Sequence, residues 1–195
     1  MSSALKWLAG VAAAVTLVAG AGASPAAEAA PVVPLADLDG RAVDPFAASK
    51  GAKAIVVLFT SVDCPFSNRY APVVGRLRET FEARGAAFWL IYPNVSESAA
   101  RIRAHLDAFG YHVRTLRDPQ HALVKLAGAL VTPEAALYDR QQRLVYHGRI
   151  DDRYVSLGLE RPAPTRHDLE EALSATLAGR PVRAASAPAV GCFIE

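Results

Sequence analysis

The chain of 195 residues is long enough for one domain with an ordinary hydrophobic core, and 52% of its residues are hydrophobic. Its 21 basic and 19 acidic side chains nearly cancel, which leaves a formal net charge of +2. That balance excludes the strongly basic surface of a typical nucleic-acid-binding protein, so we expect no nucleic-acid partner. Two cysteines are too few for a disulfide scaffold, but they are enough for one bridge, or for one reactive and one resolving thiol.

The first residues are typical of a secretory signal peptide. A positive charge at Lys6 precedes an apolar segment, and Ala21-Gly22-Ala23 is a cleavage site of the A-x-A type. We assign residues 1–23 to a signal peptide, with cleavage as late as residue 29 at a second such site, and 24–33 to a linker. The alternative is a retained N-terminal anchor, but the apolar segment is short for a membrane span. We therefore expect a periplasmic or secreted protein whose only link with a membrane is this signal, in a compartment where disulfides persist.

Two buried strands and a helix are predicted in the first half of the domain. Residues 53–60 form a continuous apolar run rich in β-branched side chains, which is typical of a strand buried on both faces. A helix is expected after Cys64, because apolar residues recur at steps of three and four from Phe66 to Phe81. Residues 87–92 predict the second buried strand, and a short strand with a turn is expected at 34–43.

The middle of the chain predicts two further helices. The first is expected over 96–109, with Phe109 among its inward-facing residues. Asp118 is expected to cap the second helix, which would begin at Pro119. The charged segment at 151–154 is interpreted as a solvated loop with local ion pairs.

The last elements predicted are a hairpin and a closing helix. Two apolar runs at 134–139 and 143–149 flank a polar turn, which indicates two antiparallel strands. The closing helix is expected to have Thr165 as its N-cap and Asp168 at its third position, and to end at Gly179.

This order of elements predicts the fold class. Helices that alternate with buried strands indicate an α/β domain over residues 34–179, and the antiparallel hairpin makes its central sheet mixed, with helices flanking it. A tail of mostly small residues follows over 180–195 and carries Cys192, the second of the two cysteines.

Cys64 lies between the end of a predicted strand and the start of a predicted helix. The unpaired amides and the dipole at a helix N-terminus stabilise an anion, so this position lowers a cysteine pKa and favours the reactive thiolate. Asp63 opposes this, because a carboxylate beside a thiol disfavours the thiolate. The alternative interpretation is a buried, inert cysteine, since free cysteines are among the most buried residues.

The segment 34–179 resembles the thioredoxin-like superfamily, in the exported redoxin branch that includes the alkyl hydroperoxide reductase and thiol-specific antioxidant proteins. Phe59 stands five residues before Cys64, Pro72 stands eight residues after it, and Thr132-Pro133 lies just before a strand, in the order and at the spacing of that superfamily. The resemblance implies a thioredoxin-like fold and a cis peptide bond before Pro133 that faces Cys64.

Two departures from the superfamily patterns affect the expected chemistry. A dithiol thioredoxin has a C-x-x-C motif, whereas this chain reads Cys64-Pro65-Phe66-Ser67, so no disulfide can form within the motif. A peroxiredoxin has P-x-x-x-T-x-x-C; here Ser61 fills the threonine position, but Val57 stands in place of the proline.

The resemblance implies a thiol–disulfide oxidoreductase or a peroxidase-like antioxidant protein that acts in redox homeostasis. Cys64 would attack a disulfide or a peroxide, and Cys192 or an external thiol would resolve the product. Arg69 would support the thiolate, and Thr132, Pro133 and Ser67 would bind the substrate. The partners implied are a thiol or disulfide protein, or a peroxide, together with an external reductant, and no cofactor is implied.

The tail is long enough to bring Cys192 to Cys64. From Gly179 it spans up to roughly 40 Å at about 3.3 Å per residue, against a radius of gyration near ~15 Å for a domain of this size. The other possibility is an unpaired or intermolecular cysteine. The rival functional hypothesis is a non-catalytic binding or metal-handling module with a structural or inert cysteine, although the histidines show no metal-ligand spacing and we predict no metal site.

Overall fold

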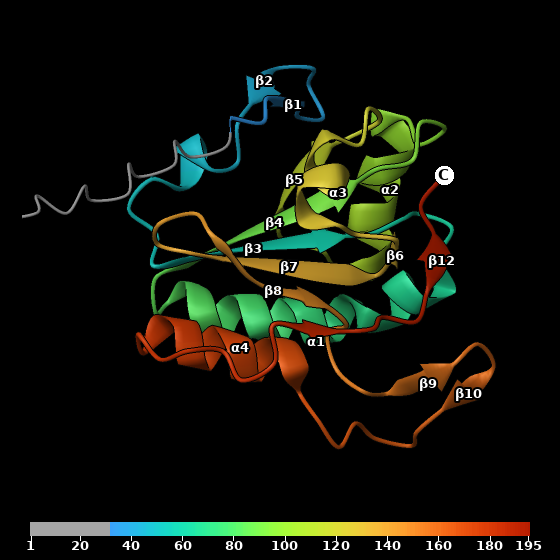
Figure 1. Ribbon diagram of the computed structural model, residues 1–195. Coiled ribbons are helices and arrows are strands. Elements are labelled where there is room, and N and C mark those ends of the chain that lie inside the picture. Colours follow the sequence, from blue (N-terminus) through green and yellow to red (C-terminus); the bar gives the residue numbers. More distant parts are fainter. Residues whose placement is uncertain (1–31) are drawn as a thin grey trace, which may run out of the picture.

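The computed structural model describes residues 32–195, and its centre is an eight-stranded mixed sheet (Figure 1). The predicted signal peptide and nearly all of the linker lie outside the described residues. The strands of the sheet are β1 (Leu35–Ala36), β2 (Ala42–Val43), β3 (Ala54–Phe59), β4 (Ala86–Tyr92), β5 (Arg114–Arg117), β7 (Glu134–Asp139), β8 (Leu144–Gly148) and β11 (Ser186–Ala187). Their order across the sheet is β11-β8-β7-β3-β4-β5-β1-β2.

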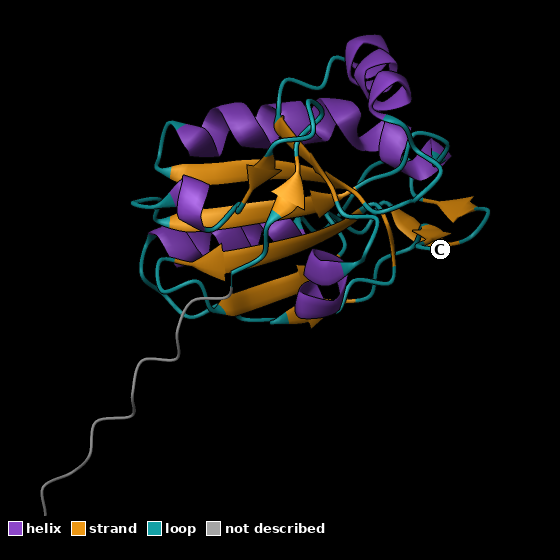
Figure 2. Ribbon diagram, turned by 90° about the horizontal axis from the view of Figure 1, so that it is seen from above, coloured by secondary structure: helices purple, strands orange, loops and turns teal. Residues whose placement is uncertain are grey.

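Helices cover both faces of this sheet (Figure 2). They are the 3₁₀ helix η1 (Ala47–Ser49) and the α-helices α1 (Pro65–Glu82), α2 (Ala99–Phe109), α3 (Ala122–Ala127) and α4 (Asp168–Leu177). Side chains of α1, α2 and α4 share one hydrophobic core, and those of α3 share the core on the opposite face with Phe46, the residue before η1. None of the helices within residues 32–195 is long and apolar enough to span a membrane.

The central strand β3 explains why the sheet is mixed. It pairs in parallel with β4 and antiparallel with β7, and it is buried along its whole length. Alternate residues of β3 enter the two cores: Val56 and Leu58 face α1 and α4, whereas Val57 and Phe59 face α3. The prediction of an α/β domain with a mixed central sheet is therefore confirmed.

Two short two-stranded ribbons lie outside the main sheet, at the end where β3 leads into α1. One is the hairpin of β9 (Tyr154–Ser156) and β10 (Leu159–Glu160). The other pairs β6 (Val131–Thr132) with β12 (Cys192–Phe193), so the last residues of the chain return to the loop that precedes β7 (Figure 1).

Three predicted helix starts were wrong by a few residues. The helix expected from residue 96 is α2, which begins at Ala99 with Ser98 as its N-cap. Asp118 does bind three amides of α3, but that helix begins at Ala122 rather than at Pro119. Thr165 is not the N-cap of α4, since its hydroxyl donates to the Asp152 carboxylate and the helix begins at Asp168.

One inward-facing assignment was also wrong. Phe109 is the last residue of α2, and it is 41% exposed rather than buried. That helix ends at Gly110, whose φ of 67° is the left-handed conformation that glycine adopts without a steric cost.

Truncating the core side chain of Leu137 should destabilise the fold. Leu137 is fully buried in the core beneath α1 and α4, so Leu137→Ala should lower the free energy of unfolding by about 2–5 kcal/mol. Urea denaturation of the reduced protein would measure this. Leu157→Ala is the matched control: Leu157 is 67% exposed, and its truncation should change stability by about 0.5 kcal/mol or less. Equal effects of the two substitutions would contradict this assignment of the core.

Candidate active site

Cys64 is the N-cap of α1 and is almost completely buried. Its backbone is extended, its amide donates to the Ser61 carbonyl, and Pro65 begins the helix at a position where no amide donor is needed. Only 1% of the residue is exposed. The predicted position of Cys64 between a strand and a helix is therefore confirmed, and the thiol lies at a helix N-terminus within a buried environment.

The loop before β7 faces this thiol. The Thr132–Pro133 peptide bond is cis, as the resemblance implied, and the Cys64 thiol donates a hydrogen bond of 3.0 Å to the Thr132 carbonyl oxygen. Thr132 itself is buried. The structure thus brings together Cys64, Thr132 and Pro133, three of the residues singled out from the sequence.

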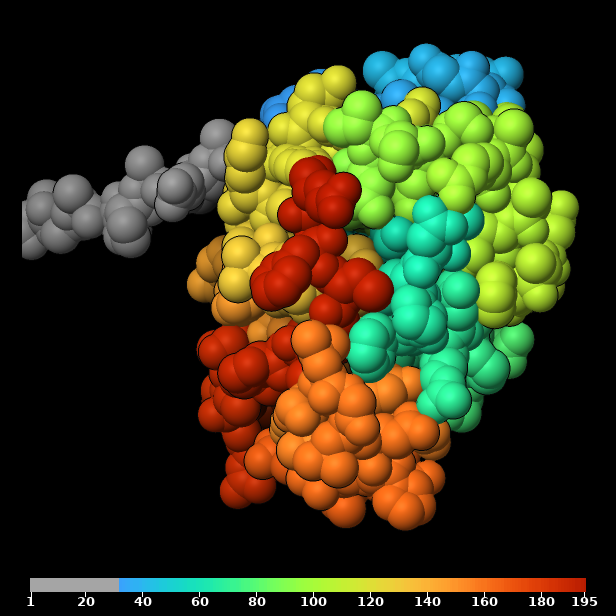
Figure 3. Space-filling model, turned by 90° about the vertical axis from the view of Figure 1, so that its right-hand side faces the viewer, coloured from blue at the N-terminus to red at the C-terminus, as the bar shows by residue number. Residues whose placement is uncertain are grey.

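The C-terminal tail brings Cys192 to the same point, 128 residues away in sequence. In the antiparallel ribbon Cys192 lies opposite Thr132 and Phe193 lies opposite Val131, and the Ile194 amide donates to the Leu130 carbonyl. Both cysteines are free thiols, and the Cys192 thiol donates to the Cys64 sulfur across 2.7 Å. Figure 3 shows the tail in red between the segment around β6 in yellow and the start of α1 in teal.

Two glycines permit the close approach of the tail. A Cβ atom on Gly191 would collide with the Thr132 carbonyl oxygen, which accepts from the Cys64 thiol. A Cβ atom on Gly148 would collide with the backbone of Ala187, where β11 adds to the edge of the main sheet. The tail therefore follows a path that only glycine allows at these two crossings.

The environment of Cys64 stabilises its thiolate, whereas that of Cys192 does not. Burial alone raises the pKa of Cys64, but hydrogen bonds from the Cys192 thiol, the Ser67 amide and the Thr132 and Ser67 hydroxyls outweigh burial and lower the pKa below its ordinary value. Burial, followed by the hydrogen bond to Cys64 and the charge of that sulfur, raises the pKa of Cys192 to about 12. Of the two thiols, Cys64 is therefore the one that ionises more readily, and Cys192 is the hydrogen-bond donor of the pair.

Ser67 occupies the position of the second cysteine in a C-x-x-C motif, and it is fully buried beside Cys64. Among the described residues, the hydroxyls of Ser67 and Thr132 are buried without a hydrogen-bond partner, although buried hydroxyls normally have one, so both are available to donate to the Cys64 thiolate once it forms. Both hydroxyls contribute to the lowered pKa of Cys64. The loss of the second cysteine therefore leaves a hydroxyl that supports the remaining thiolate.

Glu97 holds the turn that leads into Cys64, and sequence reasoning missed it. Its carboxylate accepts bonds of 2.7 Å from the Ser61 hydroxyl and from the Val62 amide, and only 1% of the residue is exposed. Burial raises its pKa. The one signal in the sequence is its position just after the second buried strand, because the carboxyl ends of parallel strands meet at one edge of a sheet.

Arg69 does not support the thiolate in this structure, contrary to the prediction. Its guanidinium lies on the exposed side of α1 and pairs with the Glu160 carboxylate of β10 at 2.7 Å, and the groups that lower the pKa of Cys64 do not include it. The predicted solvated loop at 151–154 was also wrong, since Asp151 is buried and accepts from the Tyr70 hydroxyl. These contacts attach the β9–β10 hairpin to α1.

Within residues 32–195, no group of three or more histidine, cysteine, aspartate or glutamate side chains is placed to hold a metal ion.

Comparisons with known proteins agree with this architecture. A family model described as Redoxin matches residues 24–156. A hypothetical protein from Sinorhizobium meliloti 1021 is 32% identical, with a TM-score of 0.73 over 85% of this chain and 91% of that chain. An uncharacterized conserved protein from Geobacillus kaustophilus is 28% identical, with a TM-score of 0.74 over 85% and 89%.

A more distant neighbour shares the fold alone. It is a secreted Mycobacterium tuberculosis disulfide oxidoreductase that is homologous to Escherichia coli DsbE, 17% identical, with a TM-score of 0.51 over 75% of this chain and 95% of that chain. No curated protein matches the chain.

Removing the Ser67 hydroxyl should make Cys64 less reactive. In a Cys192→Ser background, which retains a hydroxyl donor beside Cys64, Ser67→Ala should slow iodoacetamide alkylation near neutral pH several-fold, because a smaller fraction of Cys64 is thiolate. The measurement is the alkylation rate as a function of pH. Arg69→Gln in the same background should leave that profile unchanged, because the guanidinium pairs with Glu160. A slower rate in Arg69→Gln, with none in Ser67→Ala, would contradict this description of the site.

Proposed function

Since this chain belongs to the Redoxin family, we propose that it is an exported thiol-dependent redox protein in which Cys64 is the nucleophile and Cys192 the resolving thiol. The observation that carries the proposal is the position of the two sulfurs, 2.7 Å apart at the N-terminus of α1. The unequal environments of the two thiols support this division of roles.

The first step uses the Cys64 thiolate. Its sulfur attacks one sulfur of a substrate disulfide, which forms a mixed disulfide and releases the other sulfur as a thiolate. With a peroxide, the same sulfur attacks one oxygen of the O–O bond, which forms a sulfenic acid and releases the other oxygen as hydroxide or alkoxide. Val57, which stands where a peroxiredoxin has proline, favours the disulfide substrate.

The second step uses Cys192, and its pKa explains the order of events. Two of the three causes that raise the pKa of Cys192 are the hydrogen bond to Cys64 and the charge of that sulfur. Both causes disappear once Cys64 is oxidised or joined to a substrate, so Cys192 becomes easier to deprotonate at that stage. Its thiolate then attacks the Cys64 sulfur, forms the Cys64–Cys192 disulfide and releases the substrate thiolate, or hydroxide in the peroxide reaction.

The remaining predicted residues have supporting positions. The Thr132 carbonyl lies at the proposed site of reaction, next to Pro133, and the buried Ser67 hydroxyl is available to donate to the Cys64 thiolate. An external thiol completes the cycle by reducing the disulfide. Two cysteines hold the two electrons that the reaction transfers, so the proposed mechanism requires no cofactor.

Oxidation of the reduced protein tests this function. Treatment with oxidised glutathione or hydrogen peroxide should remove both thiols of the wild type and form one intramolecular disulfide, seen by mass spectrometry of the intact protein and its peptides. Cys192→Ser should stop at a mixed disulfide or sulfenic acid on Cys64, and Cys64→Ser should react at least about tenfold more slowly, since the remaining thiol has a raised pKa.

Two outcomes would count against the proposal. If neither oxidant forms the disulfide, or if Cys64 titrates at or above the ordinary thiol pKa of ~8.5, Cys64 is not the nucleophile. If the disulfide forms but excess dithiothreitol cannot reduce it in the folded protein, the bond is structural, as in the non-catalytic binding module considered from the sequence.

Export is tested separately, by expressing the full chain in a bacterium with two membranes. The signal-like sequence at the N-terminus should direct the protein to the periplasm, and the mature chain should begin at residue 24 or as late as 30. Cell fractionation and N-terminal peptide mapping would measure this. Full-length protein that stays in the cytoplasm would show that the segment is not a signal.

A further inference from the structure

A chain of three hydrogen bonds links the interior of the domain to the turn before Cys64. The Tyr92 hydroxyl lies 2.7 Å from His105 Nδ1, and His105 Nε2 lies 2.7 Å from Asn68 Oδ1. The Asn68 side-chain amide in turn donates to the Val62 carbonyl oxygen at 3.5 Å. The histidine is buried in α2, and the proposed mechanism gives its ring no role.

The turn before Cys64 is held from two sides. The Glu97 carboxylate accepts from the Val62 amide at 2.7 Å, and the Asn68 side chain donates to the carbonyl of the same residue. The Asn68 backbone amide also donates to the Cys64 carbonyl oxygen at 3.1 Å. Asn68 therefore contacts the chain both before and at the residue that carries the thiol.

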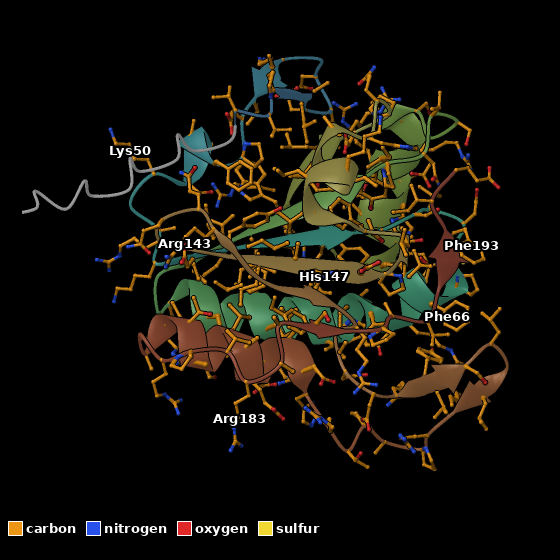
Figure 4. The ribbon with its side chains drawn as sticks, viewed as in Figure 1. Lys50, Phe66, Arg143, His147, Arg183 and Phe193 are labelled. Atoms are coloured by element: carbon orange, nitrogen blue, oxygen red, sulfur yellow. The ribbon has the colours of Figure 1, made fainter. Side chains whose placement is uncertain are left out.

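This contact reaches the turn from α2 and not from the tail. Figure 3 shows the start of α1, in teal, between the tail in red and α2 in light green. Figure 4 shows Phe66, in the first turn of α1, at the same end of the molecule as Phe193 of the tail. The tail and α2 thus adjoin the start of α1 as separate elements, and a substitution at Cys192 leaves the bonds of α2 in place.

We propose that His105 is a positioning residue for Cys64, which acts through its hydrogen bond to Asn68 on the turn that leads into the nucleophile. This inference rests on the proposed function, because it requires Cys64 to be the nucleophile, and it deepens it by naming a group that holds the sulfur in place. The ring of His105 contacts Asn68 rather than the sulfur, so its effect on Cys64 is indirect.

One neutral tautomer of His105 satisfies every bond of the chain. The Val62 carbonyl can only accept, so the Asn68 nitrogen faces it and the Asn68 oxygen faces His105. Nε2 must then carry the ring proton, which leaves Nδ1 to accept from the Tyr92 hydroxyl. Burial lowers the pKa of His105 and outweighs the charge of Asp63, so the ring is neutral near neutral pH. An apolar side chain at position 105 would leave the Asn68 amide free to turn.

The orientation of the sulfur depends on this turn because Cys64 is the N-cap of α1. An N-cap side chain can accept from the amide at the third helical position, which here belongs to Ser67. That amide is one of the groups that lower the pKa of Cys64. The bond from Asn68 to Val62 is long for an N–H···O bond, so it depends on His105 to fix the side chain that donates it. Without it, the turn is freer and the sulfur is held less well beside its donors.

The test measures iodoacetamide alkylation of Cys64 as a function of pH in the Cys192→Ser background, with urea denaturation of each variant alongside it. His105→Leu should slow alkylation near neutral pH at least about threefold, because a smaller fraction of Cys64 is thiolate. His105→Gln should keep the rate of the background variant, since its amide can donate to Asn68 in place of Nε2. A histidine that only stabilises the core would lower the free energy of unfolding in His105→Leu without moving the pH profile, and that result would overturn the proposal.

Two further variants separate the bond to Asn68 from a general loosening of α2. Ile102→Val removes a methyl group from a fully buried residue of the same helix, so it should lower stability and leave the profile unchanged. Asn68→Ala should slow alkylation as His105→Leu does, and the double variant should be no slower than either. Because Asn68 is only half-buried, its truncation still decides the question if His105→Leu does not fold. A shift in Ile102→Val equal to that in His105→Leu, or none in Asn68→Ala, would contradict the proposal.

The background variant separates this inference from the proposed function. If Cys64 titrates at or above the ordinary thiol pKa of ~8.5 before position 105 is changed, there is no stabilised thiolate to hold in place, and both proposals fail. If the pKa of Cys64 is lowered in the background and His105→Leu leaves it unchanged, only the assignment of His105 fails.

Discussion

The pairing of β12 with β6 is the contact on which the site depends. It places Cys192 opposite Thr132, whose carbonyl oxygen also accepts from the Cys64 thiol, so one backbone group positions both sulfurs. Burial opposes ionisation of Cys64, and the donors around that sulfur outweigh it. Without the tail, the Cys64 thiol would lose one of those donors, the Cys192 thiol. The last residues of the chain are therefore part of the site rather than an appendage to the domain.

Periodicity and residue type predicted most of the fold. The buried strands β3 and β4 and the helix after Cys64 were identified because apolar runs and helical spacing reflect burial directly. The predicted starts of α3 and α4 were wrong because a side chain with capping potential can form its hydrogen bonds with several different partners. Asp118 reaches past its neighbours to α3, and Thr165 binds Asp152 instead of α4. Such choices depend on tertiary contacts that spacing along the chain does not encode.

Residues of the site that depend on tertiary contacts were likewise not predictable from the sequence. Cys64 could be identified from its position between a strand and a helix, and Thr132 and Pro133 from the resemblance to thioredoxin-like proteins, and the structure brings the three together. Arg69 was predicted to support the Cys64 thiolate because it lies off the apolar stripe of its helix. In the structure its guanidinium instead forms an ion pair with Glu160, which is distant in sequence. Glu97 could not be identified, since a single carboxylate in a loop gives no pattern until the fold places it under the turn before Cys64.

The path of the tail has a consequence for the chain as a whole. A bond between Cys64 and Cys192 would close a loop of 128 residues, which contains most of the domain. In the chain-entropy model, a loop of that length restricts the unfolded chain enough to favour the folded state by about 5 kcal/mol. By thermodynamic linkage, the same free energy would favour the disulfide over the two thiols in the folded protein. The disulfide would therefore be harder to reduce in the folded domain than in the unfolded chain. Each redox cycle would then carry the protein between a more and a less stable form, so the electron donor would leave it in the form more readily unfolded and degraded.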